Sequence, residues 1–274
     1  MEGYMQIVSW NDFLEKPAPS ALTIGVFDGM HLGHLALIQK VVSLNNKPTV
    51  ITFRKNPKKL LFHDDFEGEV YSLRQKLDIF RKQGIQRVVL IDFSENWSKM
   101  KGREFLDLLE KPGMMASLVI GSNFRCGYKQ DTGADCIKEI NAAKGIATEI
   151  LPNLSLSGEL ISSSRLRTLI ISGDLEKASV MMGRNAELDL TDIESNFVPA
   201  PIKGAGNFCY SLDHADRVLP PGGFYRVLLH RETGKKAFGE EDGDEESPIE
   251  ERAYIENKKL YLPYKAESIE YIGV

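Results

Sequence analysis

A ten-residue segment combines glycines with two histidines: Gly25-Val26-Phe27-Asp28-Gly29-Met30-His31-Leu32-Gly33-His34. It follows an apolar run that predicts a strand, and it precedes a stretch with helical spacing. A helix start presents unpaired backbone N–H groups and the positive end of a dipole, and glycines let a bulky anion approach the main chain. Two imidazoles three residues apart would project on similar sides and could donate hydrogen bonds to phosphate oxygens. The segment therefore predicts a phosphate-binding turn.

This turn is neither of the two common phosphate-binding signatures. It lacks the Gly-Lys-Ser/Thr of a Walker loop and the Gly-x-Gly-x-x-Gly of a dinucleotide fingerprint. His31 and His34 are better placed to bind charge than to attack a substrate. The remaining histidines, His63, His214 and His230, have no partner at metal-ligand spacing. We expect them to be surface or structural residues.

A second constellation is Ile161-Ser162-Ser163-Ser164-Arg165-Leu166-Arg167. Serines ahead of a helical run commonly cap it, and that role alone would explain one of the three. It does not explain Arg165 and Arg167, because cations in the first turn of a helix oppose its dipole. They suggest a bound polyanion, although exposed arginines on helices are also common.

A third segment, Gly121-Ser122-Asn123-Phe124-Arg125-Cys126-Gly127, follows another predicted strand. Asn123 could orient a polar substrate and Arg125 could hold a phosphate, while Phe124 or Tyr128 could stack on a planar ring. The carboxyl ends of parallel strands meet at one edge of a sheet, so this segment is expected beside the histidine turn.

Short apolar runs alternate with helical patterns from Ala21 to about Arg184, which predicts a parallel sheet with helices on both faces. The predicted strands are residues 21–26, 49–53, 87–91, 117–121 and 146–151, and the helical patterns centre on residues 35–42, 73–80, 105–109, 137–140 and 166–171.

The pattern changes after Arg184. Six of the twelve prolines lie between Pro199 and Pro263, and β-like runs such as 224–229 and 259–262 replace the helical spacing. We predict a Rossmann-like α/β domain over residues 1–184 and a small, mainly β domain over residues 185–274. The acidic run 240–246 is interpreted as a solvated hairpin tip, since it lacks the ligand order of an EF-hand.

Composition limits the remaining classes of function. The 274 residues are 42% apolar, and the net charge of −5 argues against a general nucleic-acid binder. No apolar stretch approaches the roughly 20 residues that cross a bilayer, and the amino end lacks the pattern of a secretory signal. The three cysteines, Cys126, Cys136 and Cys209, form no Cys-x-x-Cys pair. We expect a cytoplasmic protein with no membrane or nucleic-acid partner.

These motifs, in their order and spacing, resemble the FMN adenylyltransferase module of bacterial bifunctional riboflavin kinase/FAD synthetases. The resemblance covers roughly Ala21 to Arg184 and includes the Thr52-Phe53 strand end with Pro57, and Gly173-Asp174 followed by Gly183-Arg184. It implies transfer of AMP from ATP to FMN, giving FAD and pyrophosphate, with Mg²⁺ bridging the ATP phosphates.

The resemblance also implies roles for individual residues. The catalytic group would be His31, His34, Asn123 and Arg167. ATP would be bound by Gly25, Phe27, Asp28, Gly29, Gly33, Ser162, Ser163 and Ser164. FMN would be bound by Phe53, Asn56, Pro57, Phe124 and Arg125, and no side-chain metal ligand is expected.

Three features depart from the family pattern. Thr52-Phe53-Arg54-Lys55-Asn56-Pro57 replaces the usual Thr-Phe-Asp-Pro-His-Pro, and Ser164 replaces a common threonine but keeps the hydroxyl. The tail lacks the kinase signature Gly-x-Pro-Thr-Ala-Asn, because the only Pro-Thr is Pro48-Thr49. Gly204-Ala205-Gly206-Asn207 and the segment 220–225 resemble remnants of neighbouring kinase segments, so a shortened barrel without riboflavin kinase activity is expected.

Two alternatives to an FAD synthase stay open at this point. One is a nucleotidyltransferase for another phosphorylated acceptor, which Arg54, Lys55 and Asn56 suggest. The other is a non-catalytic flavin- or nucleotide-binding protein whose β tail recruits a partner.

Overall fold

The structure is a computed structural model that describes residues 4–61, 66–110, 114–213, 215–230 and 247–273. Packing divides the chain into two compact units. The first unit comprises Met1–Phe66 and Leu73–Ile161, and the second comprises Glu67–Ser72 and Ser162–Val274. The chain therefore passes between the units at 66/67, 72/73 and 161/162.

This division does not coincide with the expected domain boundary after Arg184. Helices α8 (Ser163–Ser172) and α9 (Leu175–Met182) pack on each other and belong to the second unit, where α9 also contacts strand β17 (Ser268–Gly273). The boundary predicted from the sequence was placed where the motif ending at Arg184 stops, whereas the division into units reflects which residues pack together. As a boundary between functional modules it stays a prediction.

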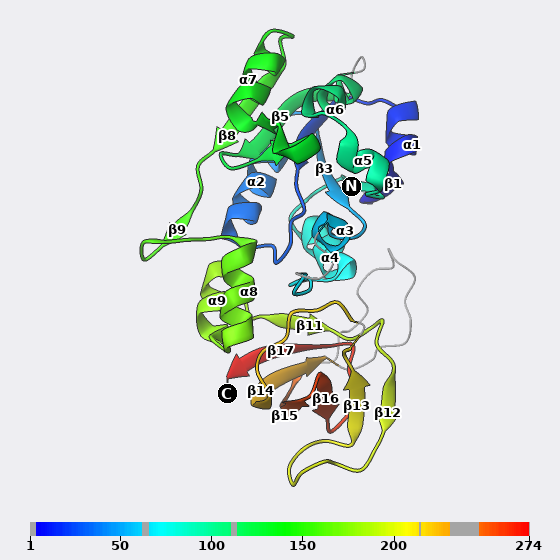
Figure 1. Ribbon diagram of the computed structural model, residues 1–274, viewed down its shortest axis with the longest axis vertical. Coiled ribbons are helices and arrows are strands. Elements are labelled where there is room, and N and C mark those ends of the chain that lie inside the picture. Colours follow the sequence, from blue (N-terminus) through cyan, green and yellow to red (C-terminus); the bar gives the residue numbers. More distant parts are fainter. Residues whose placement is uncertain (1–3, 62–65, 111–113, 214, 231–246, 274) are drawn as a thin grey trace. The chain divides into compact units, whose positions relative to one another are not determined.

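The first unit contains a six-stranded parallel sheet, visible in the upper part of Figure 1. Its order is β1 (Gln6–Ser9), β4 (Arg87–Ile91), β3 (Lys47–Phe53), β2 (Ser20–Ile24), β5 (Met115–Gly121) and β8 (Ala147–Leu151). The five predicted strands are all present. The edge strand β1 was not predicted, because only two of its four residues, Ile7 and Val8, are apolar, which is too short a run to indicate a strand.

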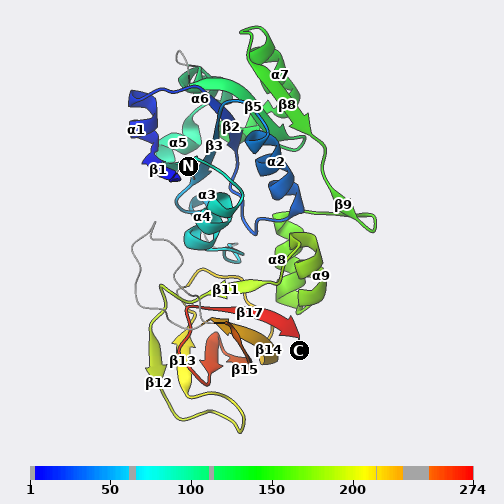
Figure 2. The ribbon, with the colours of Figure 1, turned by 180° about the vertical axis from the view of Figure 1, so that it is seen from behind.

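Helices cover both faces of this sheet, as predicted. Helices α1 (Trp10–Glu15), α6 (Gly102–Leu109) and α7 (Ala134–Ala142) contribute side chains to the core cluster on one face. Helix α2 (Leu32–Val42) packs against β2, β3 and β5 through Ile38 and Val41, which lie outside that cluster. Figure 2 shows α2 from behind.

Further elements of the first unit connect these strands and helices. They are α3 (Pro57–Leu61), α4 (Leu73–Lys82), α5 (Glu95–Lys99), the 3-10 turn η2 (Tyr128–Gln130), and the strand pairs β6 (Arg125–Cys126) with β7 (Thr132–Gly133) and β9 (Ser155–Leu156) with β10 (Glu159–Leu160).

The strand order fixes where a ligand should bind. From β2 the chain runs to β3 and β4 on one side, and it then crosses to β5 and β8 on the other. In open α/β sheets, ligands bind at the carboxyl ends of the strands, where the order reverses. The turn after β2 lies at this reversal.

The second unit contains a curled, seven-stranded antiparallel sheet, which confirms the predicted small β domain. Its order is β11 (Glu187–Asp189), β17 (Ser268–Gly273), β14 (Gly223–His230), β15 (Ile249–Glu256), β16 (Lys259–Leu262), β13 (Phe208–Ser211) and β12 (Ser195–Phe197).

Segment 67–72 joins the second unit although its neighbours in sequence belong to the first. Glu69 forms a parallel bridge with Arg217, accepts a hydrogen bond from the backbone of Val218 at 3.1 Å, and donates one to the carbonyl of Asp216 at 2.7 Å. The buried Ser72 hydroxyl donates to Asp189 Oδ2 at 2.5 Å. These contacts explain why packing assigns the segment to the second unit.

Three sequence predictions lie outside the described residues: His63, His214 and the acidic run 240–246. His230 is described, and its Nε2 lies 2.9 Å from Glu270 Oε1, which agrees with a structural role. Within the described parts of the chain, no helix combines the length and apolar character needed to cross a membrane.

Candidate active site

The turn between β2 and α2 has an unusual backbone. Phe27, Gly29 and Met30 all adopt positive φ values, of 53°, 77° and 42°. Positive φ is uncommon for a residue with a bulky side chain, and such outliers concentrate at functional sites. Thr52 of β3 helps to hold the turn, since its hydroxyl donates to the carbonyl of Val26 at 3.3 Å.

Phe27 anchors the turn in the protein interior. Its side chain is only 1% exposed and makes edge contacts with His34 and Phe80, with ring centroids 5.2 and 5.5 Å apart. A Cβ at Gly25 would stand 3.2 Å from the Phe27 ring, so glycine leaves room for it. The buried aromatic therefore fixes the backbone that precedes the helix.

His31 is the N-cap of α2, and its hydrogen bond defines its tautomer. Its Nδ1 accepts a hydrogen bond from the backbone N–H of His34 at 3.3 Å. An accepting Nδ1 carries no proton, so in the neutral ring the proton is on Nε2. His31 is therefore set up to donate from Nε2.

The two histidine rings stack at the helix start. Their centroids are 3.6 Å apart and their planes differ by 17°. Two positively charged rings at this spacing would repel each other, and an anion bound beside them would reduce that repulsion. Helix α2 also has no acidic residue in its first turn that would compete with such an anion. The arrangement is suited to a polyphosphate.

The strand end beside this turn, after β3, carries the residues expected to bind FMN. Asn56 is buried, and its Oδ1 accepts a hydrogen bond from the backbone N–H of Lys58 at 3.1 Å. Asn56 and Pro57 thus form the start of α3, a local structural role that both residue types favour. Arg54, the unexpected cation, pairs with the exposed Asp92 at 2.9 Å. Phe53 is half-buried against the core.

The other neighbouring strand end, after β5, places Asn123 and Arg125 on the surface. A turn forms there as the Phe124 N–H donates to the carbonyl of Gly121 at 2.9 Å. Phe124 packs partly against the core. Burial, helped by the charge of Asp131 and by Cys136, raises the pKa of the next residue, Cys126, to about 12. This thiol is therefore protonated at neutral pH.

The serine-arginine segment belongs to the second unit. The Ser162 hydroxyl accepts from the Arg165 N–H at 3.2 Å and caps α8, as predicted for one of the serines. Arg167 is only 5% exposed, and its Nε donates to the carbonyl of Gly68 at 3.0 Å. Part of the Arg167 guanidinium is thus engaged within its own unit. A role of Ser163, Ser164 or Arg167 toward ATP stays a prediction.

That Mg²⁺ takes part, held mainly by the phosphates of ATP, stays a prediction. Among the described residues, no group of three or more His, Cys, Asp or Glu side chains could hold a metal ion. Mg²⁺ commonly keeps several waters and is held through substrate phosphates. The buried Asp28 is the carboxylate within the turn.

Sequence reasoning did not find every residue that shapes the turn. It gave Thr52 no contact with the turn and treated Phe80 only as a marker of helical spacing. The contact of Thr52 with the turn could have been predicted, because Thr52 lies near the end of β3, the strand that neighbours β2. Nothing in the sequence pairs Phe80 with Phe27, which lies 53 positions earlier.

The general sequence pattern of FAD synthetases matches residues 14–165, more than half of the chain. The chain belongs to the FAD synthetase family. The bifunctional riboflavin kinase/FMN adenylyltransferase of Buchnera aphidicola subsp. Schizaphis graminum is 25% identical over 60% of this chain and 55% of the relative. The corresponding Escherichia coli K12 protein is 27% identical over 59% of this chain and 53% of its own. This FAD synthetase-family chain thus matches about half the length of these relatives.

For another relative of this FAD synthetase-family chain, the aligned segment covers a larger share of the relative's own length. The FAD synthetase of Listeria monocytogenes is 24% identical over 60% of this chain and 68% of its own. A crystal structure of a macrolide-efflux protein from Streptococcus pneumoniae aligns with a TM-score of 0.74, with 18% identity over 94% of this chain and 86% of that one. The structural likeness supports the two-part fold and nothing further.

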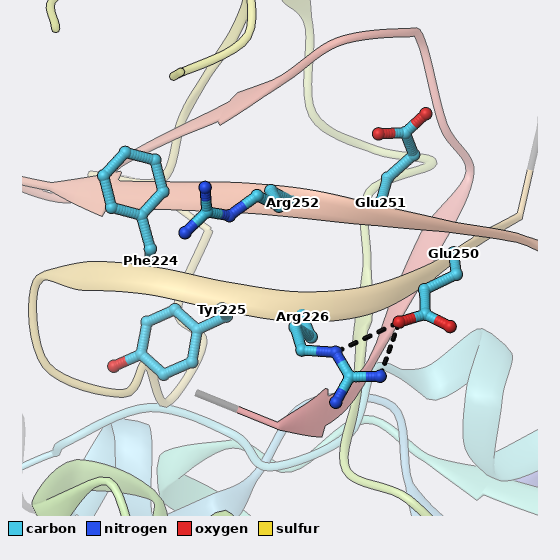
Figure 3. Close-up of a pocket in the computed structure, with 6 residues that line it drawn as sticks. All are labelled: Phe224, Tyr225, Arg226, Glu250, Glu251 and Arg252. Carbon is cyan, nitrogen blue, oxygen red and sulfur yellow. Dashed lines mark hydrogen bonds and ion pairs between the residues drawn. The ribbon is translucent and has the colours of Figure 1, made fainter. Parts of the chain in front are cut away.

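A shallow pocket of about 520 Å³ lies in the second unit of this family member, on strands β14 and β15 (Figure 3). Arg226 pairs there with Glu250 at 2.6 Å, and the Arg252 guanidinium lies 4.9 Å from the centroid of the Phe224 ring. Phe224 belongs to the segment that resembles a kinase remnant. The kinase signature itself is missing from the sequence.

Proposed function

We propose that this protein is an FMN adenylyltransferase, which transfers the AMP unit of ATP to FMN and forms FAD and pyrophosphate. The observation that carries the proposal is the stacked pair His31 and His34 at the start of α2, at the point where the strand order reverses. Membership in the FAD synthetase family supports the same activity.

The reaction needs no nucleophile from the protein. An oxygen of the FMN phosphate attacks the α-phosphorus of ATP, a new P–O bond forms, and the bond to the bridging oxygen of the β-phosphate breaks. Pyrophosphate leaves with that electron pair. Because the attacking phosphate is already anionic, the protein contributes by positioning both substrates and by stabilising the charge on the phosphates.

The histidine turn is suited to that stabilisation. Nε2–H of His31 and the ring of His34 would donate to oxygens of the triphosphate, and the free N–H groups of α2 would face the same anion. Gly25 and Gly33 leave room for the Phe27 and His31 rings. Gly29 adopts a positive φ, and the buried Phe27 and Asp28 anchor the turn. Mg²⁺, bound to ATP, would supply further positive charge.

The flanking strand ends would receive FMN. Phe53 and Phe124 lie on either side of β2, at the ends of β3 and β5, and each is half-buried. Their partly open rings suit a flavin, and Arg125 and Asn123 would contact the reacting phosphates. Asn56 and Pro57 would shape this side through the start of α3. Because Arg54 is paired with Asp92, its charge gives little support to a different acceptor.

The second unit would contribute the serine-arginine segment but no kinase activity. Ser162, Ser163, Ser164 and Arg167 would close on the triphosphate in the ATP complex. The sheet carries no Gly-x-Pro-Thr-Ala-Asn, so FMN would have to come from another enzyme. The three cysteines are free, which fits a reaction in the reducing cytoplasm.

The test is an assay of the purified chain with FMN, ATP and Mg²⁺, analysed by chromatography. FAD and pyrophosphate should form in equal amounts. The His34→Ala variant should lose on the order of 100- to 1,000-fold in turnover, because a group that stabilises developing charge is removed. The His230→Ala variant is a matched control, since that histidine pairs with Glu270 in the second unit. FAD formation no faster than in His34→Ala would refute the proposal.

A second assay addresses the tail. Riboflavin with ATP and Mg²⁺ should give no FMN under conditions in which FMN is converted to FAD. Detectable FMN would show that the β unit is a kinase despite its missing signature.

A further inference from the structure

The amino-terminal edge of the parallel sheet, opposite the phosphate-binding turn, carries a second polar cluster. Strands β1, β4 and β3 are neighbours, and they begin with Gln6, Arg87 and Lys47. Arg87 pairs in register with Gln6 on one side and with Thr49 on the other. Since side chains alternate along a strand, Gln6, Arg87, Thr49 and Lys47 share one face of the sheet.

Arg87 is a buried cation for which the described residues supply no counter-charge. Its side chain is 9% exposed, and its Nη1 is fully buried with no hydrogen-bond acceptor among the described residues. Its guanidinium carbon lies 6.0 Å from the centroid of the Phe13 ring. Burial lowers the pKa of Arg87. A buried charge without a hydrogen-bonded partner is unfavourable, so such groups normally have one.

Lys47 adds a second positive charge at the same place. Its Nζ donates to Gln6 Oε1 at 2.8 Å, and this partner is neutral. Burial and the charge of Arg87 both lower the pKa of Lys47. No carboxylate in the described parts of the chain forms an ion pair with Lys47 or Arg87. Two neighbouring cations therefore repel each other, and a bound anion would relieve this.

We propose that Arg87 and Lys47 form a binding site for a small phosphate-type oxyanion at the amino-terminal edge of the sheet. The planar guanidinium matches two oxygens of such an anion, and the ammonium group supplies a second point charge. The side-chain amide of Gln6 offers additional N–H donors, because its oxygen already accepts from Lys47. This site lies at the opposite ends of the strands from His31 and does not depend on the proposed transferase activity.

The experiment measures thermal unfolding of the full chain in sodium phosphate and in sodium chloride, at equal pH and ionic strength. Millimolar phosphate should raise the unfolding midpoint by roughly 2–4 °C, because a ligand that binds only the folded state stabilises it. The Arg87→Met and Lys47→Gln variants should lose most of this shift. The matched control Lys16→Gln, at an exposed lysine on the first unit, should keep it.

Two further results separate this site from the ATP phosphates. The variant that carries both His31→Ala and His34→Ala should retain the phosphate-induced shift. Arg87→Met should also unfold at a higher temperature than the parent in chloride alone, since it removes a buried unpaired charge. If Arg87→Met fails to fold, Lys47→Gln decides the question together with calorimetric titration of phosphate.

Pyrophosphate in place of phosphate identifies the source of the anion. If pyrophosphate raises the unfolding midpoint more than phosphate does, and Lys47→Gln loses this effect, the site binds the product of the proposed reaction. If pyrophosphate raises the midpoint less than phosphate does, the site binds free phosphate. The proposal is overturned if Lys47→Gln and Arg87→Met respond to phosphate as the parent does. It is equally overturned if the histidine variant alone removes the shift.

Discussion

Nε of Arg167 donates a hydrogen bond to the carbonyl oxygen of Gly68, a residue that lies 99 positions earlier in the chain, at a distance of 3.0 Å. Both residues belong to the second unit. Gly68 lies in the short segment 67–72, and the chain before and after this segment belongs to the first unit. A Cβ at Gly68 would meet the backbone carbon of Arg217 at 2.7 Å, so the segment is packed closely where Arg167 holds it. The arginine expected at the triphosphate therefore also holds segment 67–72, hereafter the tether, within the second unit.

We predict that Arg167→Lys destabilises the protein. Lysine cannot reproduce the Nε donor, so the Gly68 carbonyl loses its partner while a charge stays buried. The free energy of unfolding should fall by about 1.5–3 kcal/mol. Urea titration followed by circular dichroism measures this value. Arg165→Lys, in the same helical turn but half-exposed, serves as the control and should change stability by less than about 0.5 kcal/mol. Equal stability of the two variants would contradict the tether role.

Alkaline pH should weaken the same tether through Tyr71. Its hydroxyl accepts from Arg184 Nε at 3.1 Å, and burial raises its pKa to about 12 from a usual value of 10. A group with a raised pKa stabilises the folded state fully below the unfolded value, and this contribution is lost as the pH rises from 10 through 12. Stability measured at pH 9, 10 and 11 should fall more steeply in the parent than in Tyr71→Phe.

The same substitution has a cost at neutral pH. Tyr71→Phe leaves the Arg184 donor without this acceptor, and we expect a loss of about 1 kcal/mol at pH 7. Tyr128→Phe is the control, because its ring is 44% exposed and its loss should leave the alkaline profile unchanged. An identical alkaline profile in Tyr71→Phe and the parent would show that other groups cause the decline.

Most strands of the first unit could be predicted from the sequence, because parallel strands covered by helices on both faces consist of continuous apolar runs. Runs such as Arg87–Ile91 are buried throughout, so they are continuously apolar after the first residue. The histidine turn was found for a similar reason, as glycines and a helix start leave a local pattern. Its positive φ at Phe27 was not foreseen, because nothing in a phenylalanine indicates a left-handed conformation.

Contacts between distant residues were not predictable from one sequence. The arginines of the 161–167 segment were interpreted from their position in a first turn, where cations are unfavourable. The structure shows that Arg167 has a buried carbonyl partner, which no local pattern reveals. Likewise Arg54, interpreted as a possible sign of a different acceptor, pairs with Asp92, which directly follows strand β4.

That pair leads to a third prediction. Asp92→Asn should release the charge of Arg54 beside the proposed FMN site. Both side chains are largely exposed, so stability should change by less than about 1 kcal/mol. The KM for FMN, whose phosphate is negative, should fall by about two- to threefold at low salt and converge with the parent at high salt. The KM for ATP should stay constant in the same assay. A rise in the KM for FMN would mean that the ion pair itself supports the acceptor site.

The last prediction concerns the space beside His31. A Cβ at Gly33 would stand 3.2 Å from its Nδ1 and 3.3 Å from its Cε1, which is closer than ordinary contacts allow. Gly33→Ala should therefore turn the His31 ring away from the position in which Nε2 faces the phosphates, and kcat/KM for ATP should fall by about 10- to 100-fold. The helix itself should not suffer, because alanine favours helices more than glycine does. If the loss acts through His31, adding Gly33→Ala to His31→Ala should cost little more, a result that a double-mutant cycle of kcat/KM measures directly. Fully additive losses would mean that the methyl group obstructs ATP and leaves the imidazole in place.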